Sequence, residues 1–173
     1  MANVKCIGCG LEGYQVEERV AALLAYEAAV LYGEDEGIGR YVFLCPEVQN
    51  LLRAGEYLSA INSAGALAQR LEQDKALTLK ELLEGEIDGD EWEEFEEGLS
   101  ERSLDVTYLE EITCFNCGAD WKELAERLVQ DWIYLVSLGN GGNDPKVARF
   151  VADCPQVQTC LNDGHYANAI VWA

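Results

Sequence analysis

The stretch Arg40-Tyr41-Val42-Phe43-Leu44-Cys45-Pro46-Glu47-Val48-Gln49 is written twice in this chain of 173 residues. It returns 109 positions later as Arg149-Phe150-Val151-Ala152-Asp153-Cys154-Pro155-Gln156-Val157-Gln158. The match continues downstream at the same offset, and the further matched pairs are Leu52 and Leu161, Gly55 and Gly164, Tyr57 and Tyr166, Ala60 and Ala169, and Ile61 and Ile170.

A second motif, CxxCG, is repeated upstream of this stretch. Cys6-x-x-Cys9-Gly10 recurs as Cys114-x-x-Cys117-Gly118 at an offset of 108, so one residue has been gained in the connecting loop. Two motifs in the same order and at nearly the same separation are not expected by chance. We infer a tandem duplication, with repeat 1 at 1–62 and repeat 2 at 114–173. The segment 63–113 between them has no counterpart.

Composition limits the classes of partner. The chain has 32 acidic and 12 basic residues, a net charge of −20, which argues against nucleic acid or an anionic membrane. It favours docking on a basic protein surface. With 49% hydrophobic residues and 3 prolines, the chain should fold. The N-terminus turns polar at once and no apolar run is long enough to span a bilayer, so we expect a cytoplasmic or intracellular protein without a secretory signal.

Each repeat is expected to be mainly α-helical. Apolar residues recur at helical spacing over 14–32 and again over 120–138, where Asp120 is a plausible N-cap. Asp144 followed by proline is typical of a helix start. The prolines after Cys45 and Cys154 break the preceding helix or open a new one with cysteine near the N-cap. Gly33 and the run 139–143 are expected to end the first helix of each repeat by supplying positive φ, and Gly55 and Gly164 are expected to close the helices that follow the CP pairs.

The segment 63–113 is expected to be an acidic helical insert. Residues 64–71 extend the helix that begins near Tyr57, and 77–83 form another. Between 85 and 102 an acidic stretch carries Trp92, Phe95 and Leu99 on one side, as in a short helix with a solvated acidic face. Residues 106–112 read as a short strand or an extended lead-in to the second CxxC.

Seven cysteines without a signal peptide indicate metal or redox chemistry rather than a disulfide framework. His165 is the only histidine, which removes histidine-rich zinc sites and catalytic chemistry that needs a second histidine as a base. CxxCG is typical of a knuckle in which two thiolates converge on one metal ion. Because tetrahedral zinc needs four ligands, the cysteines must be combined, and two arrangements fit.

In the first arrangement each repeat builds its own zinc site. Three cysteines per repeat recur in register, and these candidate ligands are Cys6, Cys9 and Cys45 in repeat 1, and Cys114, Cys117 and Cys154 in repeat 2. The fourth ligand would be the residue after the repeated glycine, which is Glu56 in one copy and His165 in the other. Cys160 is a rival in repeat 2, but its counterpart is Leu51.

In the second arrangement the two CxxC pairs face each other across a pseudo-twofold axis and share one all-thiolate site. Cys45 and Cys154 would then be core thiols, a common environment for cysteine. An iron–sulfur cluster would also accept these ligands, but the cysteine spacing does not match a ferredoxin run, so zinc ranks above it.

Further interpretations of the cysteines remain open, in which they bind no metal ion and are free thiols, a redox dithiol or structural disulfides. A reversible CxxC dithiol would need a helix N-terminus or a cation to lower one thiol pKa, whereas the local charges are acidic. Under oxidising conditions the CxxC pairs and Cys154–Cys160 are close enough in sequence to form disulfides.

No set of residues assembles an active site, so the sequence favours a non-enzymatic structural or adaptor protein. Its two homologous helical repeats, stapled by zinc, would offer an acidic surface to protein partners within an oligomer or larger assembly, and a virus particle would fit. The alternatives are a thiol–disulfide redox protein that uses CxxC, and an acidic inhibitor that mimics the charge of nucleic acid.

Overall fold

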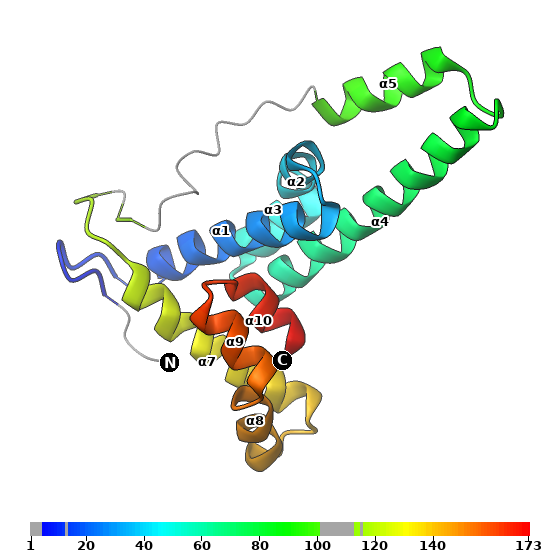
Figure 1. Cartoon of the computed structure of the whole chain (residues 1–173). Helices are drawn as coiled ribbons and strands as arrows, with labels where there is room; N and C mark the ends of the chain where they lie inside the picture. The colour runs from blue at the N-terminus through cyan, green and yellow to red at the C-terminus, as the bar shows by residue number, and fades with distance from the viewer. Residues whose placement is uncertain (1–4, 13, 101–112, 115) are drawn as a thin grey trace. The chain divides into compact units, whose positions relative to one another are not determined.

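A computed structural model describes residues 5–12, 14–100, 113–114 and 116–173, and these are mainly α-helical, as predicted (Figure 1). The expected lead-in at 106–112 lies outside the described residues. The helices, in chain order, are α1 (Tyr14–Gly33), α2 (Glu36–Phe43), α3 (Pro46–Ala54), α4 (Tyr57–Leu83), α5 (Gly89–Ser100), α7 (Lys122–Asn140), α8 (Pro145–Ala152), α9 (Pro155–Asn162) and α10 (Tyr166–Trp172). The described part contains isolated β-bridges but no strand.

The order of helices is the same in the two repeats. Helices α1 to α4 correspond to α7 to α10, and α2 and α8 begin 109 positions apart, at Glu36 and Pro145. Cys45 and Cys154 are the N-caps of α3 and α9, each followed by proline in the first turn. The expectation that the CP pair opens a new helix is therefore confirmed, because proline needs no backbone N–H partner at that position.

One expectation about helix ends is wrong. Gly33 does not have positive φ; the left-handed residue after α1 is Glu34, with φ of 50°. Gly33 is instead required for space, since a Cβ there would lie 2.6 Å from Ile38 Cγ2. Gly55 does adopt φ of 77° at the end of α3, as expected for a C-terminal glycine.

The two helices expected at 57–71 and 77–83 form one continuous helix, α4. The polar stretch 72–76 interrupts the apolar pattern but contains neither glycine nor proline, so nothing in it stops the helix. The insert also contributes α5, where the rings of Trp92 and Phe95 lie 5.7 Å apart. The side chain of Leu99 lies outside the described part of the chain.

The chain divides into two compact units, which do not follow the repeat boundaries. Unit 1 comprises residues 1–24 and 110–173, and unit 2 comprises residues 25–109, so the division falls within α1. In the described ranges, no helix combines the length and apolar character that crossing a bilayer requires.

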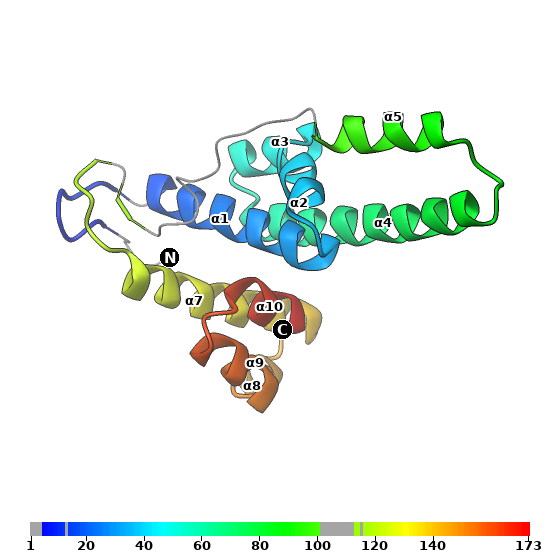
Figure 2. The same cartoon turned by 45° about the horizontal axis from the view of Figure 1, so that its top comes forward.

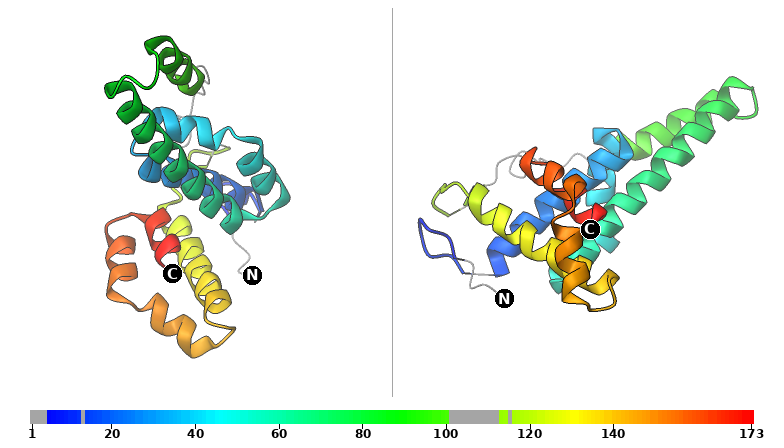
Figure 3. Two further views of the ribbon diagram at one scale, coloured as in Figure 1. Left: turned by 90° about the vertical axis from the view of Figure 1, so that its right-hand side faces the viewer. Right: turned by 60° about the horizontal axis from the view of Figure 1, so that its bottom comes forward.

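Unit 1 contains α7 to α10 and the first half of α1. Helix α10 lies against α7, and α8 and α9 form the connection between them (Figure 3). The hydroxyl of Tyr166 on α10 donates to Glu126 Oε1 on α7 at 2.9 Å. The buried core of unit 1 includes large side chains from α7 and from the residue before it: Trp121, Leu124, Leu128, Trp132 and Ile133.

Unit 2 is formed by the second half of α1 and by α2 to α5. Helix α4 packs on α2 and α3, and α5 turns back after Gly85 to contact α2 as well (Figure 2). The hydroxyl of Ser63 on α4 donates to Glu47 Oε1 on α3 at 2.6 Å. The buried apolar residues of α2 and α3 are Ile38, Val42, Phe43, Val48 and Leu52.

Candidate metal centre

The two CxxCG motifs fold into the same turn, which we call knuckle 1 (residues 5–12) and knuckle 2 (residues 113, 114 and 116–120). In knuckle 1, Cys6 N–H donates to Leu11 O at 2.9 Å and Gly10 N–H donates to Cys6 O at 2.9 Å. The glycine that follows the second cysteine needs a left-handed backbone, with φ of 72° at Gly10 and 70° at Gly118. The motif therefore dictates the turn locally.

Knuckle 2 repeats these bonds. Cys114 N–H donates to Ala119 O at 2.8 Å, and Gly118 N–H donates to Cys114 O at 2.7 Å. Each knuckle is closed by one antiparallel bridge, Lys5 with Glu12 and Thr113 with Asp120. The two turns thus present their cysteine pairs in the same way.

Unit 1 brings the four cysteines of the knuckles together. The Sγ atoms of Cys6 and Cys117 lie 3.7 Å apart, and those of Cys9 and Cys114 lie 3.6 Å apart. All four Sγ atoms lie within 4.8 Å of one another. Four thiolates around one tetrahedral zinc ion, at about 2.3 Å each, would be about 3.8 Å apart. The cluster therefore has the dimensions of a site for a single metal ion.

The cluster is symmetric with respect to exchange of the knuckles. Exchange converts the Cys6–Cys117 pair into Cys114–Cys9, and the two Sγ separations differ by only 0.1 Å. The burial of the cysteines has the same symmetry. The first cysteine of each knuckle is buried, with Cys6 and Cys114 at 3% and 2% exposure, and the second, Cys9 or Cys117, lies at the surface. Each knuckle thus supplies one inner and one outer ligand.

Knuckle 2 lies close to Gly8 of knuckle 1. A Cβ at Gly8 would lie 2.6 Å from Cys117 Sγ and 3.0 Å from Ala119 Cβ, so a larger residue would displace a candidate ligand. The corresponding residue of knuckle 2 is Asn116, whose side chain acts on Cys9. This is the main difference between the knuckles.

Trp121 supports the inner cysteine of knuckle 1. The indole is 1% exposed, and its Nε1 makes no hydrogen bond of regular geometry among the described residues. Its N–H is nevertheless the strongest influence on Cys6, whose pKa it lowers to about 6, with burial opposing and the backbone N–H groups of Cys9 and Gly8 helping. A buried donor beside a sulfur favours the thiolate, the form that binds metal.

The pKa values of the two outer cysteines, Cys9 and Cys117, are shifted in opposite directions. The side chain of Asn116, followed by the backbone N–H of Leu11, lowers the pKa of Cys9. At Cys117 the backbone N–H of Ala119 favours the thiolate, but desolvation and the three neighbouring thiols raise its pKa to about 12. The cluster therefore gives up its first protons easily and its last with difficulty.

This pattern has a simple electrostatic origin. N–H donors stabilise the first thiolates, and each further negative charge is then added within a few ångströms of the others. A bound divalent cation removes that repulsion and holds all four sulfurs deprotonated. The described arrangement can therefore hold a soft metal ion through four thiolates. All seven cysteines are free in the structure, so no disulfide occupies these sulfurs.

The structure places the other candidate cysteines outside this group. Cys45, in unit 2, donates from Sγ to Tyr41 O at 3.4 Å at the start of α3. Cys154, in unit 1, donates to Gln156 Oε1 at 2.7 Å at the start of α9. Both are half-buried N-cap residues.

The less favoured ligands also lie elsewhere. Glu56 and His165 are exposed N-caps of α4 and α10, and Cys160 is a half-buried residue of α9. Among the described residues, the group of side chains positioned to hold a metal ion consists of Cys6, Cys9, Cys114 and Cys117. Gly8, Asn116 and Trp121 were not expected at the site, and only their adjacency to the CxxC motifs could have indicated them.

Comparison with protein families, with curated proteins and with solved structures found no match for this chain.

Proposed function

We propose that the protein is a non-enzymatic helical scaffold or adaptor, stapled by one zinc ion that Cys6, Cys9, Cys114 and Cys117 share. The observation that carries this proposal is the spacing of the four Sγ atoms, with two pairs at 3.7 and 3.6 Å, close to the edge of a zinc tetrathiolate. All-cysteine, four-coordinate sites leave no open position for a substrate, and such sites are structural.

The spacing favours a single ion over an iron–sulfur cluster. A cluster places several iron and sulfide atoms between its cysteine ligands and holds those ligands farther apart. Four Sγ atoms within 4.8 Å leave room for one ion at their centre. Among single ions, zinc matches a tetrahedral all-thiolate set and needs no redox partner.

The staple would act on a long stretch of chain. Cys9 and Cys114 are 105 positions apart, so one ion links the start of repeat 1 to the start of repeat 2. Closing a loop of about 100 residues by a covalent link removes roughly 4 to 5 kcal/mol of chain entropy from the unfolded state, and a metal link has a similar effect. Metal binding would therefore be part of the folding free energy.

The shared site also supports a pseudo-twofold relation between the repeats, with the metal ion on the axis. The exchange symmetry of the sulfur distances and the equal knuckle hydrogen bonds support this relation. The scaffold would present its acidic side chains to a basic protein partner within a larger assembly, and α5 offers an exposed set of them: Asp90, Glu91, Glu93, Glu94, Glu96 and Glu97.

Elemental analysis combined with native mass spectrometry of protein purified without oxygen tests the metal proposal. One zinc per chain, lost in Cys6→Ser and retained in Cys154→Ser, is the expected result. Two zincs per chain would indicate separate sites in the repeats. Metal-free protein with all thiols reduced, purified from zinc-supplemented cells, would overturn the proposal.

A thiol–disulfide redox role is the second candidate, and a specific observation favours it. Cys9 is exposed and its pKa is lowered, so it has the features of an attacking thiolate. The first choice between the two functions is again metal content, because thiolates held by zinc do not turn over a disulfide substrate. Turnover of a small disulfide by metal-free, folded protein, abolished in Cys9→Ser, would establish the redox function.

A further inference from the structure

Helices α2 and α8 occupy the same place in the two repeats. A Cβ at Gly33 would lie 2.6 Å from Ile38 Cγ2, and a Cβ at the corresponding Gly141 would lie 2.7 Å from Val147 Cγ1. Ile38 and Val147 also correspond to each other. Each helix is therefore seated on the end of the preceding long helix through the same glycine-to-aliphatic contact.

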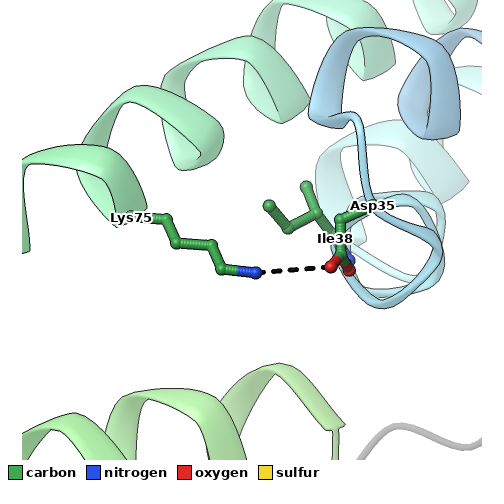
Figure 4. A network of polar contacts seen from close by, with 3 residues as sticks. All are labelled: Asp35, Ile38 and Lys75. Atoms are coloured by element: carbon green, nitrogen blue, oxygen red, sulfur yellow. Dashed lines mark hydrogen bonds and ion pairs between the residues drawn. The ribbon is translucent and has the colours of Figure 1, made fainter. Parts of the chain in front are cut away.

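In repeat 1 a further helix covers this contact between α1 and α2. The same Cβ position at Gly33 lies 3.5 Å from Ala68 Cβ on α4, and α2 also packs on α5. Lys75, about two turns farther along α4 than Ala68, donates from Nζ to Asp35 Oδ2 at 3.3 Å (Figure 4). In this setting Ile38 and Val42 are completely buried, at 0% exposure each.

In repeat 2 the corresponding face of α8 is exposed among the described residues. Helix α8 packs mainly on α7 and α9. Val147 is 40% exposed and Phe150, the counterpart of Tyr41, is 79% exposed. Large apolar side chains on one helix face, at positions i and i+3, are typical of a surface that binds another helix.

The aspartate that caps α2 also has a counterpart at the start of α8. Asp35 caps α2 by accepting from Ile38 N at 3.1 Å through Oδ1, which leaves Oδ2 to accept from Lys75. Asp144 also caps its helix, α8, accepting through Oδ1 at 2.8 Å from Lys146 N, which is the second residue after it and not the third. The carboxylate that a lysine of α4 reaches in repeat 1 therefore has an exposed equivalent in repeat 2.

We propose that the face of α8 formed by Asp144, Val147 and Phe150 is a docking surface for an amphipathic helix of a partner protein. The partner helix would do for α8 what residues 64–83 of α4 do for α2. It would place small and apolar residues over Val147 and Phe150 and a lysine or arginine against Asp144. Repeat 1 supplies the template for this occupant, both in shape and in charge.

This inference goes beyond the proposed metal staple. The α8 surface contains none of the four clustered cysteines, and the repeat 1 template does not depend on a metal ion. Loss of helix binding and loss of metal are separate measurements on the same full-length chain, so one can fail while the other stands.

The test uses a fluorescently labelled synthetic peptide with the sequence of residues 64–83 as the probe, titrated with the full-length protein and followed by anisotropy. The chain's own α2 is already covered, so the peptide should bind saturably at α8. Phe150→Glu should weaken binding at least tenfold, whereas Leu31→Glu, at an exposed leucine of α1 in unit 2, should not change it.

Two charge substitutions test whether Lys75 of the bound peptide lies against Asp144 of the protein. A peptide carrying Lys75→Glu should bind several-fold more weakly to the wild-type protein, and Asp144→Asn, which keeps a capping side chain, should remove that difference between the peptides. Circular dichroism confirms that each variant remains folded.

Three results would overturn the proposal. These are an absence of saturable binding, binding that is unaffected by Phe150→Glu, or self-association of the protein that Phe150→Glu abolishes. The last result would identify a second copy as the occupant of the α8 face.

Discussion

The two halves that repeat in the sequence are alike at their knuckles and differ at the helices α2 and α8. Gly10 and Gly118 differ by 2° in φ, and the paired sulfur distances differ by 0.1 Å. By contrast Ile38 is fully buried and Val147 is 40% exposed, although both make the same contact with the preceding helix. Residues that match in the sequence therefore have equivalent surroundings in the knuckles and different surroundings in α2 and α8.

The difference follows from how each region is held. In the shared cluster each sulfur is positioned against three others, so a shift in one knuckle would disturb both. Helix α2 is covered by elements of the segment 63–113, which has no counterpart after repeat 2 in this sequence, namely the long extension of α4 and helix α5. Among the described residues, Val147 and Phe150 of α8 remain exposed. Substitutions at matched positions can test this contrast.

The largest effect is expected at the knuckles. Cys114→Ser should lower the melting temperature by about 10 °C or more, because it removes a buried ligand from a site that contributes to folding. Cys160→Ser should lower it by only a few degrees, since Cys160 lies on α9 outside the cluster. Equal shifts in differential scanning calorimetry would contradict the assignment of ligands.

A second contrast concerns the covered and open helices. Ile38→Ala should cost about 2 to 4 kcal/mol in the free energy of unfolding, since it leaves a cavity beneath α4. Val147→Ala should cost less than about 1 kcal/mol, because its side chain is partly exposed. Urea denaturation measures both values, and similar losses would mean that α8 is covered within the chain.

A pH-dependent contrast is expected on the long helices. Glu27 is half-buried on α1, and burial raises its pKa from 4.5 to about 7. The folded state therefore binds this proton more tightly than the unfolded state, and stability from Glu27 is lost as the pH rises from about 4.5 through 7.

Glu27→Gln should accordingly increase stability at pH 8, by about 1 to 3 kcal/mol, and give no gain at pH 4. The matched control is Leu135→Glu at the corresponding position of α7, where 53% exposure lets the charge remain hydrated. The effect of Leu135→Glu on the free energy of unfolding should not vary between pH 4 and pH 8. A gain from Glu27→Gln that is the same at both pH values would rule out the buried carboxylate as its source.

The smallest contrast separates the two helix caps. Asp35→Ala should cost about 1 to 2 kcal/mol, because it removes both the N-cap of α2 and the ion pair with Lys75. Asp144→Ala should cost about 1 kcal/mol, for the cap of α8 alone. Thermal denaturation can resolve the difference, and a larger loss at Asp144 would reverse the proposed comparison.

Local signals predicted much of the fold. The cap at Asp144, the two CP helix starts and the C-terminal glycine at Gly55 all follow from backbone chemistry that acts within a few residues. The continuous α4 was missed because the polar residues 72–76 break the apolar periodicity without breaking the helix. Gly33 was misread because its neighbour across the turn, Ile38, is not visible in a local pattern.

The candidate site was only partly predictable. All four clustered cysteines were recognisable as ligands, but Cys45 and Cys154 recur in the sequence with equal regularity. The choice of four depends on which segments, more than 100 positions apart, meet in unit 1. Trp121 was expected only as an apolar helix residue, since its action on Cys6 needs that same tertiary placement.

Zinc K-edge X-ray absorption of the purified full-length protein tests the shared site most directly. The shared site predicts one zinc ion per chain surrounded by four sulfur atoms at about 2.3 Å, with no nitrogen or oxygen neighbour. A mixed shell that contains nitrogen or oxygen, with two zinc ions per chain, would contradict it and would place the metal with Cys45, Cys154, Glu56 or His165.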